Sequence, residues 1–189
     1  MQNDFCLGGS LAVPTAEQII EPINKLLVAS SDTICPVFAT RDWHPAQSNH
    51  FRDYGGTWPT HCVAGTSGAA FHTELGLDTN VVIISKGTEC DTDGYSAFDG
   101  INSDDLSLLE VLRGIQVEEL LVCGLATDYC VQASVLDALE RGFRVSVVND
   151  AIAAVNLKTG DGNAALIRMR AAGAHTISTT EALYKLAAL

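Results

Sequence analysis

Short runs of aliphatic and β-branched residues alternate along this chain with stretches of helical periodicity, and this alternation limits the possible folds more than any other feature. The runs expected to form strands are Ile34 to Thr40, Val81 to Ser85, Glu119 to Leu125, Arg144 to Val148 and His175 to Ser178. The stretches expected to form helices run from Thr15 toward Ser30, Asp105 to Ile115, Thr127 to Arg141, Asn163 to Ala172 and Thr180 to Leu189. The pattern predicts an α/β fold, a three-layer doubly wound parallel sheet with helices on both faces. Its ligands should gather at the carboxyl ends of the strands.

Local signals indicate where the helices begin and end. Thr15 and Gln18 match a capping box, so the first helix is expected to begin there, although Pro22 should kink it or shift its start. Gly114 and Gly142 stand where a glycine commonly ends a helix. We find no internal repeat, so residues 1–189 are expected to form one domain.

Charge and hydropathy exclude several classes of protein. The formal net charge is −12 with only 11 basic residues, which would repel a phosphate backbone, so we expect no nucleic-acid partner. No apolar run approaches the roughly 20 residues that span a bilayer, and the first residues lack the basic-then-apolar order of a signal peptide. The six cysteines are scattered and are expected to be reduced. We therefore expect a cytoplasmic protein with a small-molecule partner and no membrane partner; a homo-oligomer is compatible with the sequence.

One long segment, from Arg41 to about Asn80, has neither helical nor strand periodicity. It contains both tryptophans, Trp43 and Trp58, and four of the five histidines. Disordered segments are poor in aromatic residues, whereas long ordered loops are commonly functional. This composition indicates a site.

Candidate metal ligands lie at the start of that segment. Asp42 and His44 directly follow a predicted strand, and His50 and His61 come after them. One carboxylate and three imidazoles suit Zn²⁺, Mn²⁺ or Fe²⁺. From spacing alone, the alternative that these histidines only form local hydrogen bonds stays open. His72 is not included, because nothing pairs it with the others.

A candidate nucleophile follows the strand predicted at Glu119 to Leu125. Cys130 lies in the first turn of the next helix, where unpaired N–H groups and the helix dipole favour a thiolate and could receive an oxyanion. Lys86 ends another predicted strand at the same edge of the sheet and could stabilise negative charge. The alternatives are a buried structural cysteine and a solvated lysine.

Together these motifs resemble those of the nicotinamidase (pyrazinamidase) branch of the isochorismatase-like cysteine hydrolase superfamily. The matching segments span residues 1 to about 150 in the family's order. They are Met1-Gln2-Asn3-Asp4-Phe5 with Gly8-Gly9-Ser10-Leu11, Thr40-Arg41-Asp42-Trp43-His44, His50-Phe51, Trp58-Pro59-Thr60-His61-Cys62-Val63, Lys86-Gly87, Tyr95-Ser96-Ala97-Phe98 and Gly124-Leu125-Ala126-Thr127-Asp128-Tyr129-Cys130-Val131.

The resemblance implies an amidohydrolase that converts nicotinamide to nicotinate and ammonia through a cysteine thioester, as in the salvage of pyridine nucleotides. It makes Cys130 the nucleophile and Lys86 its charged neighbour, with the amides of Ala126 and Cys130 as the oxyanion hole and a cis peptide before Ala126. It implies the metal ligands Asp42, His44, His50 and His61, with the metal holding the pyridine nitrogen. It also implies that Phe5, Trp58 and Tyr95 wall the substrate ring.

The sequence departs from the family at one position. The family's catalytic aspartate lies two residues before the residue that matches Gln2, at the end of a central strand, so we expect this aspartate and its strand directly before Met1. Asp4 is no substitute, because the family has an aspartate there as well. Two alternatives remain: another amidohydrolase of the superfamily with a ureido or carbamoyl substrate, and a metal- and ligand-binding pseudoenzyme if the aspartate is absent. The metal set counts against the first, and Cys130 disfavours an isochorismatase.

Overall fold

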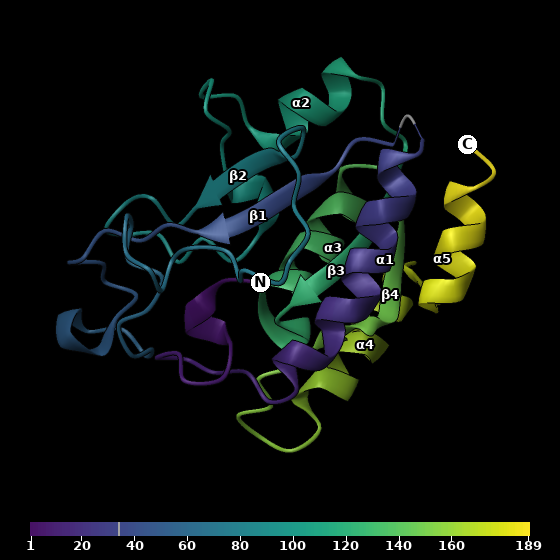
Figure 1. Ribbon diagram of the computed structural model, residues 1–189. Coiled ribbons are helices and arrows are strands. Elements are labelled where there is room, and N and C mark those ends of the chain that lie inside the picture. The colour runs from purple at the N-terminus through teal and green to yellow at the C-terminus, as the bar shows by residue number, and fades with distance from the viewer. Residues whose placement is uncertain (34) are drawn as a thin grey trace.

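The strands form two parallel sheets, as Figure 1 shows for a computed structural model that describes residues 1–33 and 35–189. In the first, β1 (Phe38–Asp42) pairs with β2 (Val82–Lys86). In the second the order is β3-β4-β5, formed by Glu119–Leu125, Arg144–Ala153 and His175–Ile177. All pairings within these sheets are parallel, which confirms the predicted α/β class.

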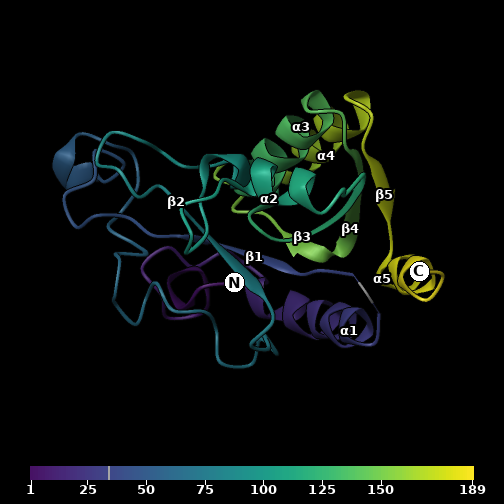
Figure 2. The same cartoon turned by 90° about the horizontal axis from the view of Figure 1, so that it is seen from above.

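The helices lie in two layers, one on each side of the strands. Figure 2 shows α2 (Leu108–Gly114), α3 (Gln132–Glu140) and α4 (Asp161–Ala171) on one side, with α1 (Ile20–Ser31) and α5 (Thr179–Leu186) on the other. A separate apolar core fills each side. Leu112, Val135 and Met169 belong to the first core, whereas the second contains Ile23 and Leu186.

The first strand begins later than expected, for a reason that the backbone explains. The run expected from Ile34 becomes a strand only at Phe38, because Pro36 has no N–H to donate to a ladder. Ile34 itself lies outside the described residues. By contrast, β3 has the expected bounds, and β4 continues beyond its expected end to Ala153.

The capping box expected at Thr15 is wrong. Thr15 adopts a left-handed conformation with φ of 62° and its side chain caps nothing, so a short 3₁₀ turn (Ala16–Ile19) comes first and α1 begins at Ile20. Pro22 then lies in the first turn of α1, where a missing N–H breaks no helical hydrogen bond. A capping box does form between Ser107 and Glu110, which is why α2 begins later than Asp105.

The facing edges of β1 and β3 are not hydrogen-bonded to each other. A cavity of about 570 Å³ lies there, and residues of both strands line it, together with Leu26 of α1 and Leu186 of α5. Met1 also lines this cavity, so the amino terminus, marked N in Figure 1, lies among the strands. Within residues 1–33 and 35–189 the fold thus has an open slot between its two sheets.

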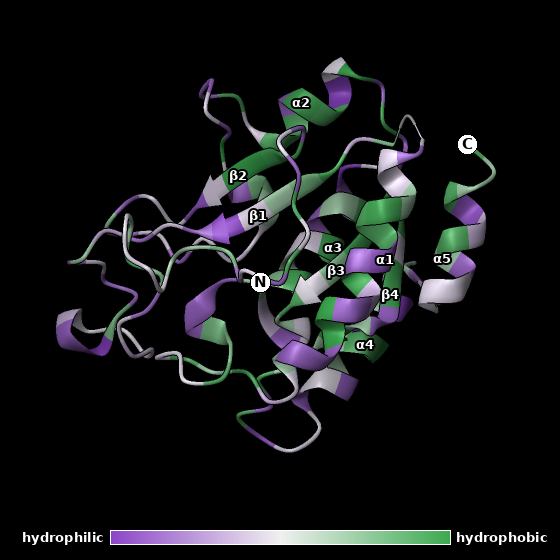
Figure 3. Cartoon of the chain, in the orientation of Figure 1, coloured by the Kyte–Doolittle hydropathy of each residue, from purple (hydrophilic) through white to green (hydrophobic). Residues whose placement is uncertain are grey.

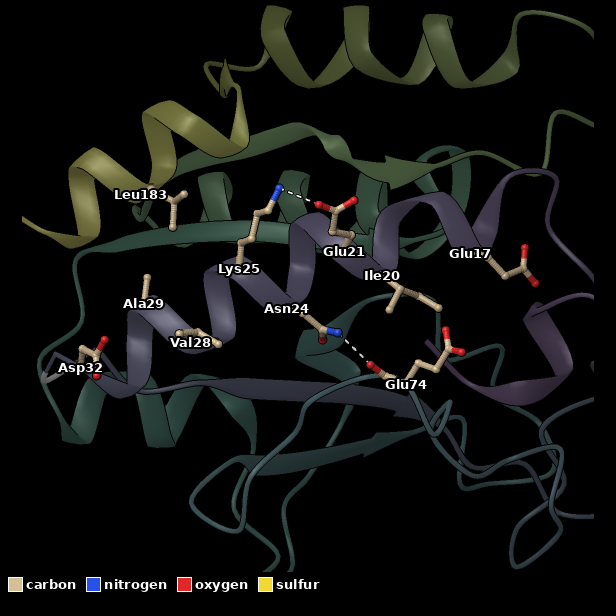
Figure 4. A pocket seen from close by; sticks show the side chains of 10 residues that line it. All are labelled: Glu17, Ile20, Glu21, Asn24, Lys25, Val28, Ala29, Asp32, Glu74 and Leu183. Atoms are coloured by element: carbon tan, nitrogen blue, oxygen red, sulfur yellow. Dashed lines mark hydrogen bonds and ion pairs between the residues drawn. The ribbon is translucent and has the colours of Figure 1, made fainter.

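A second pocket lies on the outer face of α1, well exposed to solvent. Figure 4 shows its acidic and amide side chains, with Lys25 paired to Glu21 and Asn24 bonded to the carbonyl of Glu74. It is lined by none of the candidate catalytic or metal-binding residues. No helix in the described part of the chain is both long and apolar enough to cross a membrane.

Candidate active site

The parallel pairing of β1 with β2 places two charged side chains next to each other at the carboxyl ends of the strands. Asp42 and Lys86 are partners in the register, and Figure 3 shows the C-terminal tip of β1 turning hydrophilic. The Lys86 ammonium donates to a carboxylate oxygen of Asp42 and, at 2.6 Å, to the carbonyl of Gly94. It also lies 3.2 Å from the sulfur of Cys130. The structure therefore brings Lys86 and Cys130 together, as the sequence predicts.

Electrostatics set the charge states of these three groups. Burial opposes ionisation of Asp42, but the Lys86 ammonium outweighs it and holds the pKa of that carboxyl below its usual range. Burial likewise opposes the charge on Lys86, yet Asp42 and Cys130 raise the pKa of its ammonium above the ordinary value. Lys86 is thus a permanent cation at neutral pH.

The expectation that the Cys130 pKa is lowered is wrong for this arrangement. Burial raises the pKa of the thiol, and this effect exceeds the lowering caused by Lys86. Asp42 adds to the rise, because a negative neighbour disfavours a thiolate. Helix position alone could not reveal this, since it carries no information about how much water reaches the sulfur. Cys130 is therefore a thiol at neutral pH and needs a proton acceptor to become a nucleophile.

Cys130 lies in a π-helical turn, Thr127–Val131, that directly follows β3 and precedes α3. The expected cis peptide joins Leu125 to Ala126. The Ala126 carbonyl accepts hydrogen bonds from the amides of Tyr129 and Val131, and the Cys130 amide is not among its donors. An acidic side chain of the same turn, Asp128, fixes it to the chain beyond β4 through two backbone amides, at 2.9 and 2.8 Å.

Three imidazoles converge beside this group. The nearest ring nitrogens of His44, His50 and His61 all lie within 4.8 Å of one another, and all three residues are buried. Burial lowers the pKa of His44 to about 4, and it also lowers that of His61, so both rings are neutral at neutral pH. Neutral imidazole is the form that binds metal ions.

The hydrogen bonds of these rings leave the metal-binding nitrogens free. The Nδ1 atoms of His44 and His61 face the carbonyls of Gly87 and Pro59, at 3.0 and 2.8 Å. Because a carbonyl only accepts, each Nδ1 carries the hydrogen and each Nε2 keeps its lone pair. The Nε2 of His44 is the one buried side-chain nitrogen or oxygen atom in the described residues that has no partner. The donor set therefore fits a divalent cation.

Asp42, predicted as a fourth metal ligand, is not among the ligand-type atoms that lie within 4.8 Å of one another in the described residues. One of its oxygens bonds Lys86, and the group of ligand-type atoms consists of the three imidazoles. Asp42 nevertheless lies close enough to His44 and His61 for their protonated forms to lower the pKa of its carboxyl. Lys86 of β2 binds this carboxylate because the register of β1 with β2 pairs the two residues, and sequence spacing does not reveal that register. His72 stays outside the group, as expected.

Aromatic side chains wall the same cavity. Phe5, Trp58 and Tyr95 line it together with Cys130, and the Trp58 indole donates to the Tyr95 hydroxyl at 2.8 Å. Tyr129, which sequence reasoning missed, packs edge-on against Trp58 with ring centroids 4.9 Å apart. Its position directly before Cys130 in the sequence could have indicated that it lies in the site.

Gln2 is a second residue that sequence reasoning did not assign to the site. It is buried, and its amide bonds both the N–H and the carbonyl of Asp42, at 2.8 and 2.7 Å. The side-chain amide thus makes the pair of hydrogen bonds that a neighbouring strand would make with the backbone at the end of β1. It fixes the position of the carboxylate that Lys86 binds.

The comparisons place this geometry in a family. The isochorismatase domain model matches residues 1–181. The chain belongs to the isochorismatase-domain family.

Three proteins of known name illustrate the similarity in sequence and in fold. Nicotinamidase from Escherichia coli is 38% identical over 190 residues, covering 92% of this chain and 89% of its own. A pyrazinamidase from Pyrococcus horikoshii, solved in complex with zinc, shares 41% identity and a TM-score of 0.86 over 94% of both chains. PnC1 from L. infantum, solved in complex with nicotinate, shares 34% identity and a TM-score of 0.81 over 95% of this chain and 89% of its own.

The raised pKa of Cys130 gives this isochorismatase-domain protein a testable pH dependence. Iodoacetamide reacts with thiolates, so labelling of Cys130 should be slow at pH 7 and accelerate as the pH rises toward and past 9.0, the ordinary thiol value. Lys86→Met removes the cation that favours the thiolate and should shift this rise to higher pH. Peptide mapping after timed labelling measures both rates.

The exposed Cys90 serves as an internal control, because burial does not protect it and Lys86 contacts Cys130 instead. Its labelling should be faster than that of Cys130 at pH 7 and equal in the two proteins, with circular dichroism checking that the variant is folded. Labelling of Cys130 that is unchanged or faster in a folded Lys86→Met protein would contradict the assigned role of the ammonium.

Proposed function

We propose that this protein is a nicotinamidase that hydrolyses nicotinamide to nicotinate and ammonia. The observation that carries the proposal is the cavity in which Cys130 and Lys86 face the same space as His50, His61 and an aromatic wall. A nucleophile beside a group of metal-binding imidazoles suits a flat carboxamide whose ring carries a nitrogen. Similarity to the E. coli nicotinamidase and to a fold solved with nicotinate supports this substrate.

The aromatic side chains bind the ring of the substrate in this proposal. Phe5, Trp58, Tyr95 and Tyr129 offer flat apolar surfaces that suit a pyridine. His44, His50 and His61, with Asp42 beside them, hold a divalent ion. When bound, that ion supplies a Lewis acid for the pyridine nitrogen and so orients the ring. Similarity to a pyrazinamidase solved with zinc supports such an ion without fixing its identity as Zn, Mn or Fe.

Catalysis proceeds through a thioester on Cys130. The deprotonated sulfur attacks the carboxamide carbon, and the amides of Ala126 and Cys130 stabilise the oxyanion. Lys86 stabilises the thiolate before the attack, because its ammonium is only 3.2 Å from the sulfur. The proton removed from the sulfur passes, through the same acceptor, to the amide nitrogen, which leaves as ammonia when the C–N bond breaks. Water then hydrolyses the thioester to release nicotinate and the thiol.

The proton acceptor for Cys130 is the aspartate expected directly before Met1. Asp42 does not serve, since Lys86 holds it as an ion pair and keeps its pKa low. Met1 lines the cavity that contains Cys130. A residue joined to its nitrogen would therefore enter the same cavity. An extended segment in the slot would pair with the open edges of both β1 and β3. Each backbone N–H or C=O that stays buried and unpaired costs about 1 to 3 kcal/mol of folding free energy.

The first prediction of this proposal concerns that carboxylate. A chain extended before Met1 by five apolar residues and an aspartate should release ammonia from nicotinamide faster than residues 1–189, by on the order of 10² to 10⁴, the usual contribution of a general base. The matched control is the same extension ending in asparagine, which fills the slot without the carboxylate. Cys130→Ala in the active chain should abolish turnover, whereas Cys90→Ala should not.

Equal activity of the aspartate and asparagine extensions would show that the proton acceptor lies elsewhere. Absence of turnover in both, with metal and nicotinamide still bound, would favour the pseudoenzyme. Ammonia release from ureido or carbamoyl compounds in preference to nicotinamide would favour the other amidohydrolase.

The second prediction separates ring binding from amide chemistry. Chelation or His50→Ala should remove the metal and lower kcat/KM for nicotinamide by on the order of 100-fold, because orientation of the ring is lost. Benzamide has no ring nitrogen and should lose much less. Metal content and kcat/KM are measured for both amides, with His72→Ala as the matched histidine control outside the group. A stripped enzyme that keeps its preference for nicotinamide would refute a role of the metal at the pyridine nitrogen.

A further inference from the structure

The third imidazole of the metal group differs from the other two in the partner of its Nδ1. His44 and His61 use backbone carbonyls, whereas the Nδ1 of His50 lies 2.7 Å from a carboxylate oxygen of Asp93. The side chain of His50 is only 5% exposed, but that of Asp93 is 63% exposed. A charged acceptor thus reaches from the surface to a buried ligand.

Asp93 belongs to a loop of residues 87–94 that contacts three groups of the site: His44, His50 and Lys86. At one end, the Gly87 carbonyl faces His44. At the other end the Gly94 carbonyl accepts from Lys86 at 2.6 Å, and between them the Cys90 carbonyl accepts from the Asn49 amide at 2.7 Å. Asn49 directly precedes His50, so the loop holds the backbone of His50 as well as its ring.

The two ends of this loop pack so closely that only glycine fits. Gly94 has φ of +62°, and a Cβ there would come within 2.2 Å of the Gly87 backbone nitrogen. A Cβ on Gly87 would come within 2.5 Å of the His44 ring. Asp93 therefore projects from a backbone whose position is fixed at the next residue, Gly94, and its carboxylate bonds His50 from there.

We propose that Asp93 is a positioning residue of the metal site, which orients His50 and strengthens it as a ligand. Its carboxylate fixes the hydrogen on Nδ1, turns Nε2 toward His44 and His61, and donates electron density to the ring through a charge-assisted hydrogen bond. The inference rests on the metal site of the proposed function but requires no turnover for its test.

A purely structural role would have a different signature. Loss of Asp93 leaves the buried Nδ1 hydrogen of His50 without its acceptor, which costs about 1 to 3 kcal/mol of folding free energy. The metal-free protein should therefore still fold, with only a small loss of stability, whereas its affinity for the metal should fall clearly. Asp91 provides a matched control, because it is an exposed aspartate of the same loop and has no side-chain hydrogen bond within the described residues.

The experiment titrates the metal-free full chain with Zn²⁺ and with Co²⁺, recording the Kd and the visible absorption of the cobalt form. Asp93→Ala should raise both Kd values by about 10- to 100-fold, the usual effect of losing such a partner, and should alter the cobalt spectrum. Asp93→Asn keeps an acceptor oxygen without the charge and should fall between. Asp91→Ala should match the wild type in Kd and spectrum, and all four metal-free proteins should fold, with unfolding temperatures that differ by only about 2 to 10 °C.

An Asp93→Ala protein whose Kd and spectrum match those of Asp91→Ala would overturn the proposal, even if the wild type hydrolyses nicotinamide. A wild type that binds neither metal would overturn it together with the metal site. Weakened binding in Asp93→Ala alongside an inactive chain extended by the aspartate would leave Asp93 in its role and count against the nicotinamidase activity.

Discussion

The buried Lys86 ammonium is the interaction on which the rest of the site depends. A charge taken out of water is tolerated only where its hydrogen bonds are satisfied, and Lys86 has three acceptors: the Asp42 carboxylate, the Gly94 carbonyl and the Cys130 sulfur. Each acceptor comes from a different part of the fold, namely β1, the loop after β2, and the turn after β3. The parallel sheets bring these parts to one edge, and the ammonium binds them together there.

The metal group and the thiol share supports, so they are not independent sites. Asp42 precedes His44 by two residues and bonds Lys86. The loop of residues 87–94 contacts His44 through its first residue, and His50 and Lys86 through its last two. A displacement of this loop would move imidazoles and ammonium together. The shared loop explains how the metal-binding imidazoles and the nucleophile can keep a fixed relative position, although no single strand carries both.

Sequence patterns predict the local elements well and the long-range contacts poorly. The apolar run at Glu119–Leu125 forms β3 with the expected bounds, and the strand ends correctly indicate that Lys86 and Cys130 meet. The partner of Asp42 and the raised pKa of Cys130 depend on strand register and on desolvation, which no spacing encodes. Asp93 escapes prediction because an exposed aspartate in a loop is ordinarily solvated, and only the fold places it against His50.

The thioester on Cys130 is the central claim, and it can be observed directly. The measurement is an acid quench of the active chain during turnover of nicotinamide labelled in the pyridine ring, followed by peptide mapping of the protein-bound label. The account predicts ring label on the peptide that contains Cys130, lost on treatment with hydroxylamine, and absent from Cys130→Ala. Ammonia release without any protein-bound ring label under conditions that trap thioesters, or label on another residue, would contradict it.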